Sequence, residues 1–144
     1  MKSKVRVVRK KWAELRDHAL SSFPEECIGL FECQEIKGKI EITNIFPCRN
    51  VARHKKTQGQ ISKPEMRELK KLISRGEKKG LMYGTYHSHP ASGSIKLSDV
   101  DKFVAKIYKL FRLQIVLGIS GKRVRKNFWK YKKPNLIEGR IEVY

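Results

Sequence analysis

The stretch Tyr83-Gly84-Thr85-Tyr86-His87-Ser88-His89-Pro90, followed by Ser98-Asp99-Val100-Asp101, decides how this chain is interpreted. The first segment predicts a strand that ends at the histidines, because the proline cannot continue a strand ladder. Residues two apart on a strand point to the same face, so both imidazoles can converge on one ion. The second segment predicts a helix start with Asp101 in its first turn. Two imidazoles and a carboxylate are the ligand set of a catalytic zinc site, so His87, His89 and Asp101 are candidate Zn²⁺ ligands.

Each part of this pattern also has a simpler interpretation. Histidines at the end of a strand can be exposed polar residues, and Ser98-x-x-Asp101 is a helix capping box that needs no metal. The loop at 91–97 is long enough to bring the helix start back towards the histidines. The combination of the two histidines with a carboxylate just downstream favours the metal site.

A hydrolytic zinc site also needs a base that takes a proton from water. Glu25 and Glu26 stand just before an apolar segment that begins at Cys27. A carboxylate that enters the core side of a sheet is costly unless it has a task or a partner. Both carboxylates could equally be surface residues of the loop after Pro24, and the pattern alone does not choose between them.

The remaining segments alternate between strand and helix patterns. In chain order they predict a strand at 4–8, a helix at 9–23, a hairpin of 27–32 and 40–48 that turns at Lys37-Gly38, an exposed and mobile loop at 50–61, a helix opened by a Ser62/Glu65 capping box, a buried strand at 81–86, a helix at 98–111, a central strand at 113–119, a basic strand at 124–131 and a short edge strand at Ile141 and Val143. This order predicts a single domain over residues 1–144 of the α/β (α+β) class, with a mixed, mainly antiparallel sheet flanked by helices.

The last two helices carry apolar stripes at helical spacing, which we expect to be buried. The stripe of the earlier helix is Met66, Leu69, Leu72 and Ile73, and that of the later helix is Val100, Phe103, Val104, Ile107 and Leu110.

The net charge of +19 is the strongest feature of the composition. The basic residues concentrate at 122–133, where aromatic residues are interleaved. Such a segment attracts nucleic acid or an acidic protein surface. It is also compatible with a solvated strand face whose aromatic side chains point into the core.

The sequence has no pattern of a secreted or membrane protein. No apolar run approaches the roughly 18 residues that span a bilayer, and no apolar segment of a signal peptide follows the basic N-terminus. We therefore expect a soluble, cytoplasmic protein without a membrane partner. The cysteine count is three, which argues against a disulfide scaffold, although Cys27 and Cys48 could pair if the hairpin brought them face to face.

The pattern His87-Ser88-His89-Pro90, seven residues, Ser98, two residues and Asp101 resembles the signature of the JAMM (MPN-plus) zinc metalloproteases. That family also has an upstream E-x-x-G followed by two hydrophobic residues, and Glu26-Cys27-Ile28-Gly29-Leu30-Phe31 is similar to it. The resemblance selects Glu26 over Glu25, and it implies the JAMM/MPN (cytidine-deaminase-like) architecture in a minimal, prokaryotic-type form.

The resemblance implies a role for each site residue. His87, His89 and Asp101 would bind Zn²⁺, Glu26 would be the general base, and Ser98 would donate a hydrogen bond to the oxyanion. It also implies hydrolysis of isopeptide or peptide bonds at the C-terminal tail of a ubiquitin-like modifier or sulfur-carrier protein.

Two alternatives remain open. One is a nucleic-acid-associated binding module on the same fold, since the H-x-H-P-x-S-G run also resembles a DNA-repair-associated branch of the superfamily. The other is a peptidase for a different bond, such as a cell-wall peptide, which the missing secretion signal disfavours.

Overall fold

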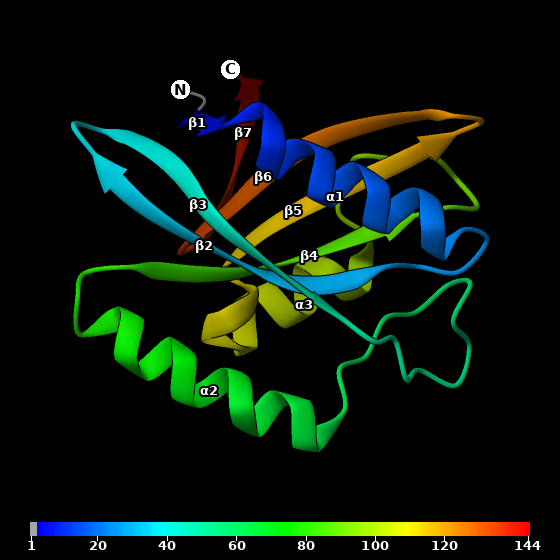
Figure 1. The fold of residues 1–144 in the computed structure, drawn as a ribbon, viewed down its shortest axis with the longest axis horizontal. Helices are drawn as coiled ribbons and strands as arrows, with labels where there is room; N and C mark the ends of the chain where they lie inside the picture. The colour runs from blue at the N-terminus through cyan, green and yellow to red at the C-terminus, as the bar shows by residue number, and fades with distance from the viewer. Residues whose placement is uncertain (1–2) are drawn as a thin grey trace.

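A computed structural model describes residues 3–144, so Met1 and Lys2 of the predicted domain lie outside the described residues. The elements of this range alternate between strands and helices in nearly the predicted order (Figure 1). They are β1 (Ser3–Val7), α1 (Arg9–Ser22), β2 (Ile28–Ile36), β3 (Lys39–Cys48), α2 (Lys63–Glu77), β4 (Met82–His89), α3 (Asp99–Ile107), a 3-10 turn (Lys109–Phe111), β5 (Leu113–Ser120), β6 (Arg123–Lys132) and β7 (Asn135–Val143).

The strands form a closed, mixed sheet in the order β1-β3-β2-β4-β5-β6-β7. The β2–β3, β2–β4, β5–β6 and β6–β7 pairs are antiparallel, and the other three pairs are parallel. The predicted mixed, mainly antiparallel sheet with flanking helices is therefore confirmed. β5 is buried along nearly its whole length, as expected of a central strand.

The prediction of a short edge strand near Ile141 and Val143 is wrong. β7 has nine residues and pairs on one side with β6 and on the other with β1. Its first half pairs with β6 and its second half with β1, so β7 closes the sheet, and Ile141 becomes part of the core.

The hairpin between β2 and β3 turns where the sequence predicts. Lys37 and Gly38 both have positive φ angles, 51° and 77°, which is the requirement of a two-residue type I′ turn. The resulting register places Cys48 opposite Ile28 rather than Cys27. The three cysteines are buried and free, so the conceivable Cys27–Cys48 bridge does not form.

The helices lie on both sides of the sheet: α1 covers one side, and α2 and α3 lie towards the other (Figure 1). α1 contributes Leu15 and Ala19 to the core. At the start of α2 the Ser62 hydroxyl accepts the Glu65 N–H at 3.3 Å, as predicted. The reciprocal half of the capping box is absent from the bonds of the described residues, since Glu65 Oε1 accepts the N–H of Arg49 at 3.3 Å instead.

The apolar stripes of α2 and α3 are less buried than predicted. The stripe of α2 is only half-buried. α3 ends at Ile107 rather than at Phe111, because Tyr108 adopts an extended backbone before the 3-10 turn. In α3 the buried residue is Ala105, whereas Val100, Phe103 and Ile107 are exposed. The helix is rotated so that Asp101 and Ala105, four residues apart, face inward, which turns the apolar stripe to solvent.

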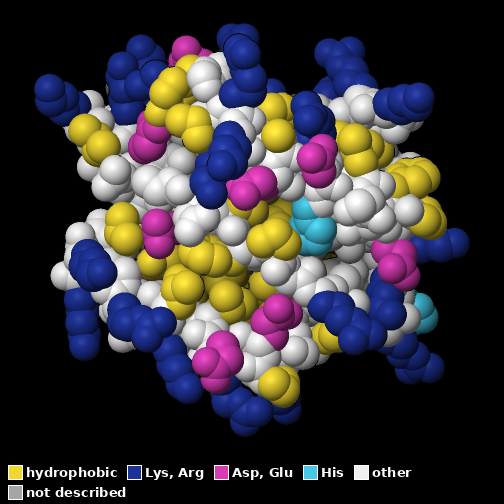
Figure 2. Space-filling view, in the orientation of Figure 1, with side chains coloured by type: hydrophobic (Ala, Val, Ile, Leu, Met, Phe, Trp, Pro, Cys, Tyr) yellow, Lys and Arg dark blue, Asp and Glu magenta, His cyan; other side chains and the backbone are white. Residues whose placement is uncertain are grey.

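Lysine and arginine side chains surround the face shown in Figure 2, and hydrophobic side chains gather in its lower centre. Among residues 3–144, no helix combines the length and the apolar character needed to cross a bilayer.

Candidate metal centre

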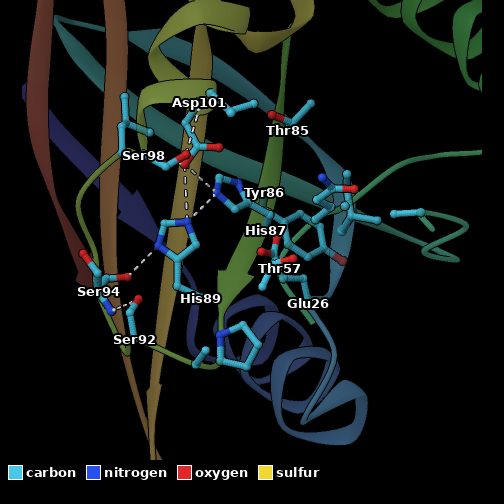
Figure 3. Close-up of a pocket in the computed structure, with 18 of the residues that line it drawn as sticks. Glu26, Thr57, Thr85, Tyr86, His87, His89, Ser92, Ser94, Ser98 and Asp101 are labelled. Carbon is cyan, nitrogen blue, oxygen red and sulfur yellow. Dashed lines mark hydrogen bonds and ion pairs between the residues drawn. The ribbon is translucent and has the colours of Figure 1, made fainter. Parts of the chain in front are cut away.

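β4 carries the two histidines at its C-terminal end, between the neighbouring strands β2 and β5. His87 pairs with Ile28 of β2, and His89 pairs with Gly118 of β5. Because the two histidines are two residues apart, their rings point to the same side of the sheet (Figure 3). Their Nε2 atoms lie 3.1 Å apart. The two histidine side chains therefore converge at the end of a strand, as predicted.

The first turn of α3 brings the carboxylate to this pair. Asp101 Oδ2 lies 3.1 Å from His87 Nε2 and 3.3 Å from His89 Nε2. The same oxygen accepts the N–H of Ser98 at 2.9 Å, while the Ser98 hydroxyl accepts the N–H of Asp101 at 3.1 Å. The capping box and the candidate ligand set, which the sequence left as alternatives, are thus both present and share Asp101.

The three donor atoms fit a tetrahedral zinc ion. They all lie within 4.8 Å of one another, and their shortest separations are 3.1, 3.1 and 3.3 Å. A tetrahedral ion with bonds of about 2.0–2.1 Å separates its ligand atoms by about 3.3–3.4 Å. Two nitrogens and one oxygen would hold such an ion with three protein ligands and leave a fourth position for water.

A carbonyl group fixes the orientation of His89. Its Nδ1 lies 3.0 Å from the Ser94 carbonyl oxygen, which can only accept a hydrogen bond, so Nδ1 carries the proton and the lone pair is on Nε2. This is the orienting contact that metal-binding histidines ordinarily have.

Two residues of the basic segment hold the loop that carries Ser94. Arg125 Nη2 donates to the Gly93 carbonyl at 2.6 Å, and Trp129 Nε1 donates to the Ile95 carbonyl at 3.0 Å. At the alternate positions of β6, away from this loop, Lys126 Nζ lies 4.6 Å from the centre of the Trp12 ring of α1, and Phe128 is fully buried in the core. Part of the predicted basic and aromatic segment therefore has a structural task next to the candidate site.

Glu26 lies at the entrance to β2 and lines the same cleft as the histidines, whereas Glu25 is exposed. The Glu26 side chain is only 8% exposed, and Figure 3 shows it across the cleft from Asp101. Burial raises the pKa of Glu26, and the two nearby histidines moderate that rise. A buried carboxylate with a raised pKa beside candidate metal ligands is suited to exchanging a proton there.

The pKa values of Asp101 and His89 shift in opposite directions. Burial alone would raise the pKa of Asp101, but hydrogen bonds with the histidines outweigh burial and hold the pKa well below its ordinary value. Burial alone would lower the pKa of His89, but its contacts with Asp101 and the Ser94 carbonyl raise it.

Asn50 is a residue of the site region that the sequence analysis missed. Its Nδ2 donates to the carbonyls of Glu26 at 3.0 Å and Gln58 at 2.8 Å, and its Oδ1 accepts from Ala52 at 3.0 Å and Gln60 at 3.1 Å. The loop at 50–61 is largely exposed, as predicted, but these bonds tie it to the backbone of Glu26. An asparagine at a strand–loop boundary is a typical hydrogen-bonding residue, yet its partners cannot be identified from sequence.

Ser88, between the two histidines, was also missed. Its side chain is fully buried on the opposite side of β4, where its hydroxyl accepts the N–H of Cys27 at 2.8 Å. The Ser88 N–H donates in turn to the Cys27 carbonyl at 3.2 Å. These bonds connect the strand end that carries the histidines to the residue next to Glu26.

The cleft has a volume of about 830 Å³, and its walls come from the 50–61 loop and from the continuous stretch that runs from the loop after β4 into α3. One wall is the 50–61 loop, one is the loop after β4, and one is the start of α3, which contributes Val100 and Val104 beside Asp101.

Comparison with known proteins gives the family and the fold. The search among curated proteins found no match. Among solved structures, the solution structure of the protein DSY2949 from Desulfitobacterium hafniense is similar, with a TM-score of 0.75 and 20% sequence identity over 97% of this chain and 92% of that chain. A family of prokaryotic homologs of the JAB domain matches residues 9–129, which include all five candidate site residues. The chain therefore belongs to the prokaryotic homologs of the JAB domain.

Proposed function

We propose that this protein is a zinc-dependent metallopeptidase that hydrolyses an isopeptide or peptide bond at the C-terminal tail of a ubiquitin-like modifier or sulfur-carrier protein. The observation that carries the proposal is the convergence of His87, His89 and Asp101 within one cleft that also contains the buried Glu26. Membership in the JAB-domain family and the resemblance to the JAMM signature support the same chemistry.

When bound by these three residues, Zn²⁺ would lower the pKa of water and polarise the scissile carbonyl. Glu26 accepts the proton of the attacking water and later delivers it to the leaving amine. The buried position of Glu26 raises its pKa, which makes the carboxylate a better proton acceptor for the first half of this exchange.

Ser98 donates a hydrogen bond to the oxygen that becomes negatively charged. Its hydroxyl oxygen accepts the Asp101 N–H at 3.1 Å, which leaves the hydroxyl hydrogen available for a ligand in the cleft. The helix start therefore holds the donor in place before the substrate arrives, which is the condition for effective oxyanion stabilisation.

A fusion assay tests the proposal. Ubiquitin-like and sulfur-carrier proteins, each fused through a Gly-Gly tail to a reporter, are incubated with the zinc-loaded protein, with and without a chelator. Cleavage at the end of the tail that stops with chelator and returns with zinc is the expected result. Zinc-loaded protein that cleaves none of these fusions would refute the proposed activity, and a chain that binds no zinc with His87 and His89 intact would refute the metal site.

A further inference from the structure

The outer side of α3 is a hydrophobic surface that the fold does not use. Val100 is 69% exposed, Phe103 61% and Ile107 53%, and Tyr108, just beyond the helix, is 56% exposed. These four are half of the exposed large hydrophobic residues in the described part of the chain. Exposed apolar residues gathered on one helix are typical of an interaction surface, whereas scattered ones need no explanation.

The exposure follows from the candidate metal site. α3 turns Asp101 towards the histidines and Ala105 into the core. Residues 100, 103 and 107 then lie on another side of the helix, where no element of the described chain covers them. The orientation that serves the carboxylate thus presents an apolar stripe to solvent.

This surface is continuous with the cleft. Val100 belongs to both, since it lines the cleft beside Asp101 and is also the first residue of the exposed stripe. From Val100 to Ile107 the stripe extends about 10 Å along α3 at the helical rise of about 1.5 Å per residue. A protein that inserts its tail into the cleft would have its folded body beside this stripe.

The charges around the stripe identify the kind of partner. Apart from the Lys109–Glu77 ion pair, the charged residues exposed along α3 and at its two ends are one acid, Asp99, and four cations, Lys96, Lys102, Lys106 and Arg112. No described carboxylate forms an ion pair with Lys102 or Lys106, whereas Lys109 is bound to Glu77 at 2.8 Å. A second copy of this chain, with its net charge of +19, would bring like charges together, so an acidic partner fits better.

We propose that the outer side of α3, formed by Val100, Phe103, Ile107 and Tyr108 with Lys102 and Lys106, docks the folded body of an acidic protein whose C-terminal tail enters the cleft. This inference rests on the proposed function for the tail but assigns a separate surface to the body. Apolar side chains supply the contact area, and the unpaired lysines select and orient the acidic partner.

The test compares a double variant on α3 with a matched control. Phe103→Ser with Ile107→Ser removes two exposed apolar side chains of the stripe, and Phe23→Ser with Ile36→Ser removes two that are 53% and 48% exposed elsewhere. The probe is an acidic sulfur-carrier protein of the ubiquitin fold, fused through its Gly-Gly tail to a fluorescent protein. A fluorogenic peptide with the same last six residues reports on the cleft alone.

We expect the ratio of KM for the fusion to KM for the peptide to rise at least tenfold in the α3 variant and to stay unchanged in the control. Calorimetry measures binding of the fusion to the zinc-loaded Glu26→Gln variant. Adding the α3 changes to this variant should weaken binding by the same factor. Without the α3 changes, binding should weaken as the salt concentration rises. Equal ratios in the α3 variant and the control would overturn the docking surface while leaving the hydrolase intact.

Three further outcomes separate the two proposals. Binding through α3 without any cleavage by the wild type would support the docking surface and overturn the peptidase. Failure of the Glu26→Gln protein to bind the acidic probe at low salt would overturn the docking surface. A wild type that sediments as a dimer, and that the α3 changes convert to a monomer, would also overturn it.

Discussion

Replacing Gly118 by alanine should weaken metal binding without changing any ligand. Gly118 lies on β5 opposite His89, and a Cβ at this position would lie 2.8 Å from the Gly93 carbonyl carbon and 3.1 Å from the Ser94 carbonyl oxygen. The Ser94 carbonyl is the group that orients His89. The added methyl group must push this loop away, and the orienting contact loosens with it.

Gly118→Ala should lower both the unfolding free energy and the zinc affinity, and each loss has its own size. Overpacking of a tight site costs about 1–3 kcal/mol of unfolding free energy. Loss of a contact that orients a metal-binding histidine ordinarily lowers metal affinity about 10–100-fold. We therefore expect a lower unfolding midpoint and zinc affinity that falls by one to two orders of magnitude.

Gly84→Ala provides the control, because its Cβ would also overpack the sheet but away from the Ser94 loop: it would crowd the Leu113 carbonyl of β5 and lie 2.6 Å from the Phe31 ring of β2. Competition with a zinc indicator measures affinity, and thermal unfolding of the metal-free proteins measures stability. Both variants should be destabilised, but Gly118→Ala alone should lose zinc affinity by the larger factor. Equal zinc affinities in the two variants would refute the argument that the Ser94 loop orients His89.

Three more results are expected. Glu26→Gln should abolish hydrolysis and retain zinc. Because burial raises the pKa of Glu26, its ionised form destabilises the folded state at pH 7, so the metal-free variant should unfold at a higher temperature than the metal-free wild type. This difference should disappear below pH 4.5, the ordinary pKa of the group. A lower midpoint for the variant at pH 7 would contradict this. Asn50→Asp replaces the amide that donates to the Glu26 and Gln58 carbonyls, so amides of the 50–61 loop should exchange faster and stability should fall by about 1–3 kcal/mol for the two bonds. Unchanged exchange in that loop would show that Asn50 does not hold it. Finally, if residues 122–133 bind nucleic acid, affinity for a DNA duplex should fall steeply with salt and disappear when Lys122, Arg123, Lys130, Lys132 and Lys133 are neutralised; absence of binding at low salt would exclude that role.

Local patterns allowed much of the fold and the candidate site to be predicted. The type I′ turn at Lys37-Gly38, the strand that ends at His89 and the cap at Ser98 all depend on residues within a few positions of one another. The spacing of the histidines and the carboxylate is similarly local, so the assembly of the triad could be anticipated.

Contacts between distant segments could not be predicted. β7 pairs with β1, which lies more than a hundred residues earlier, and no local pattern indicates that pairing. The partners of Asn50 are carbonyl groups, which every residue has, so the sequence does not mark them.

The stripe of α3 was misassigned for a different reason. An apolar stripe indicates that a helix has one hydrophobic side, but it does not say whether this chain or another protein covers that side. In α3 the inward direction is set by Asp101, a polar residue, and the periodicity of Val100, Phe103 and Ile107 carries no information about that choice.

The serine between the histidines has a consequence for how the site can fail. On β4 the odd-numbered positions 87 and 89 face the cleft, while Ser88 holds the segment next to Glu26 from the other side. A slip of β4 by one residue against β2 and β5 would turn both histidines away and release that segment in the same step. One strand register therefore sets both the direction of the two histidines and the position of the segment that carries Glu26.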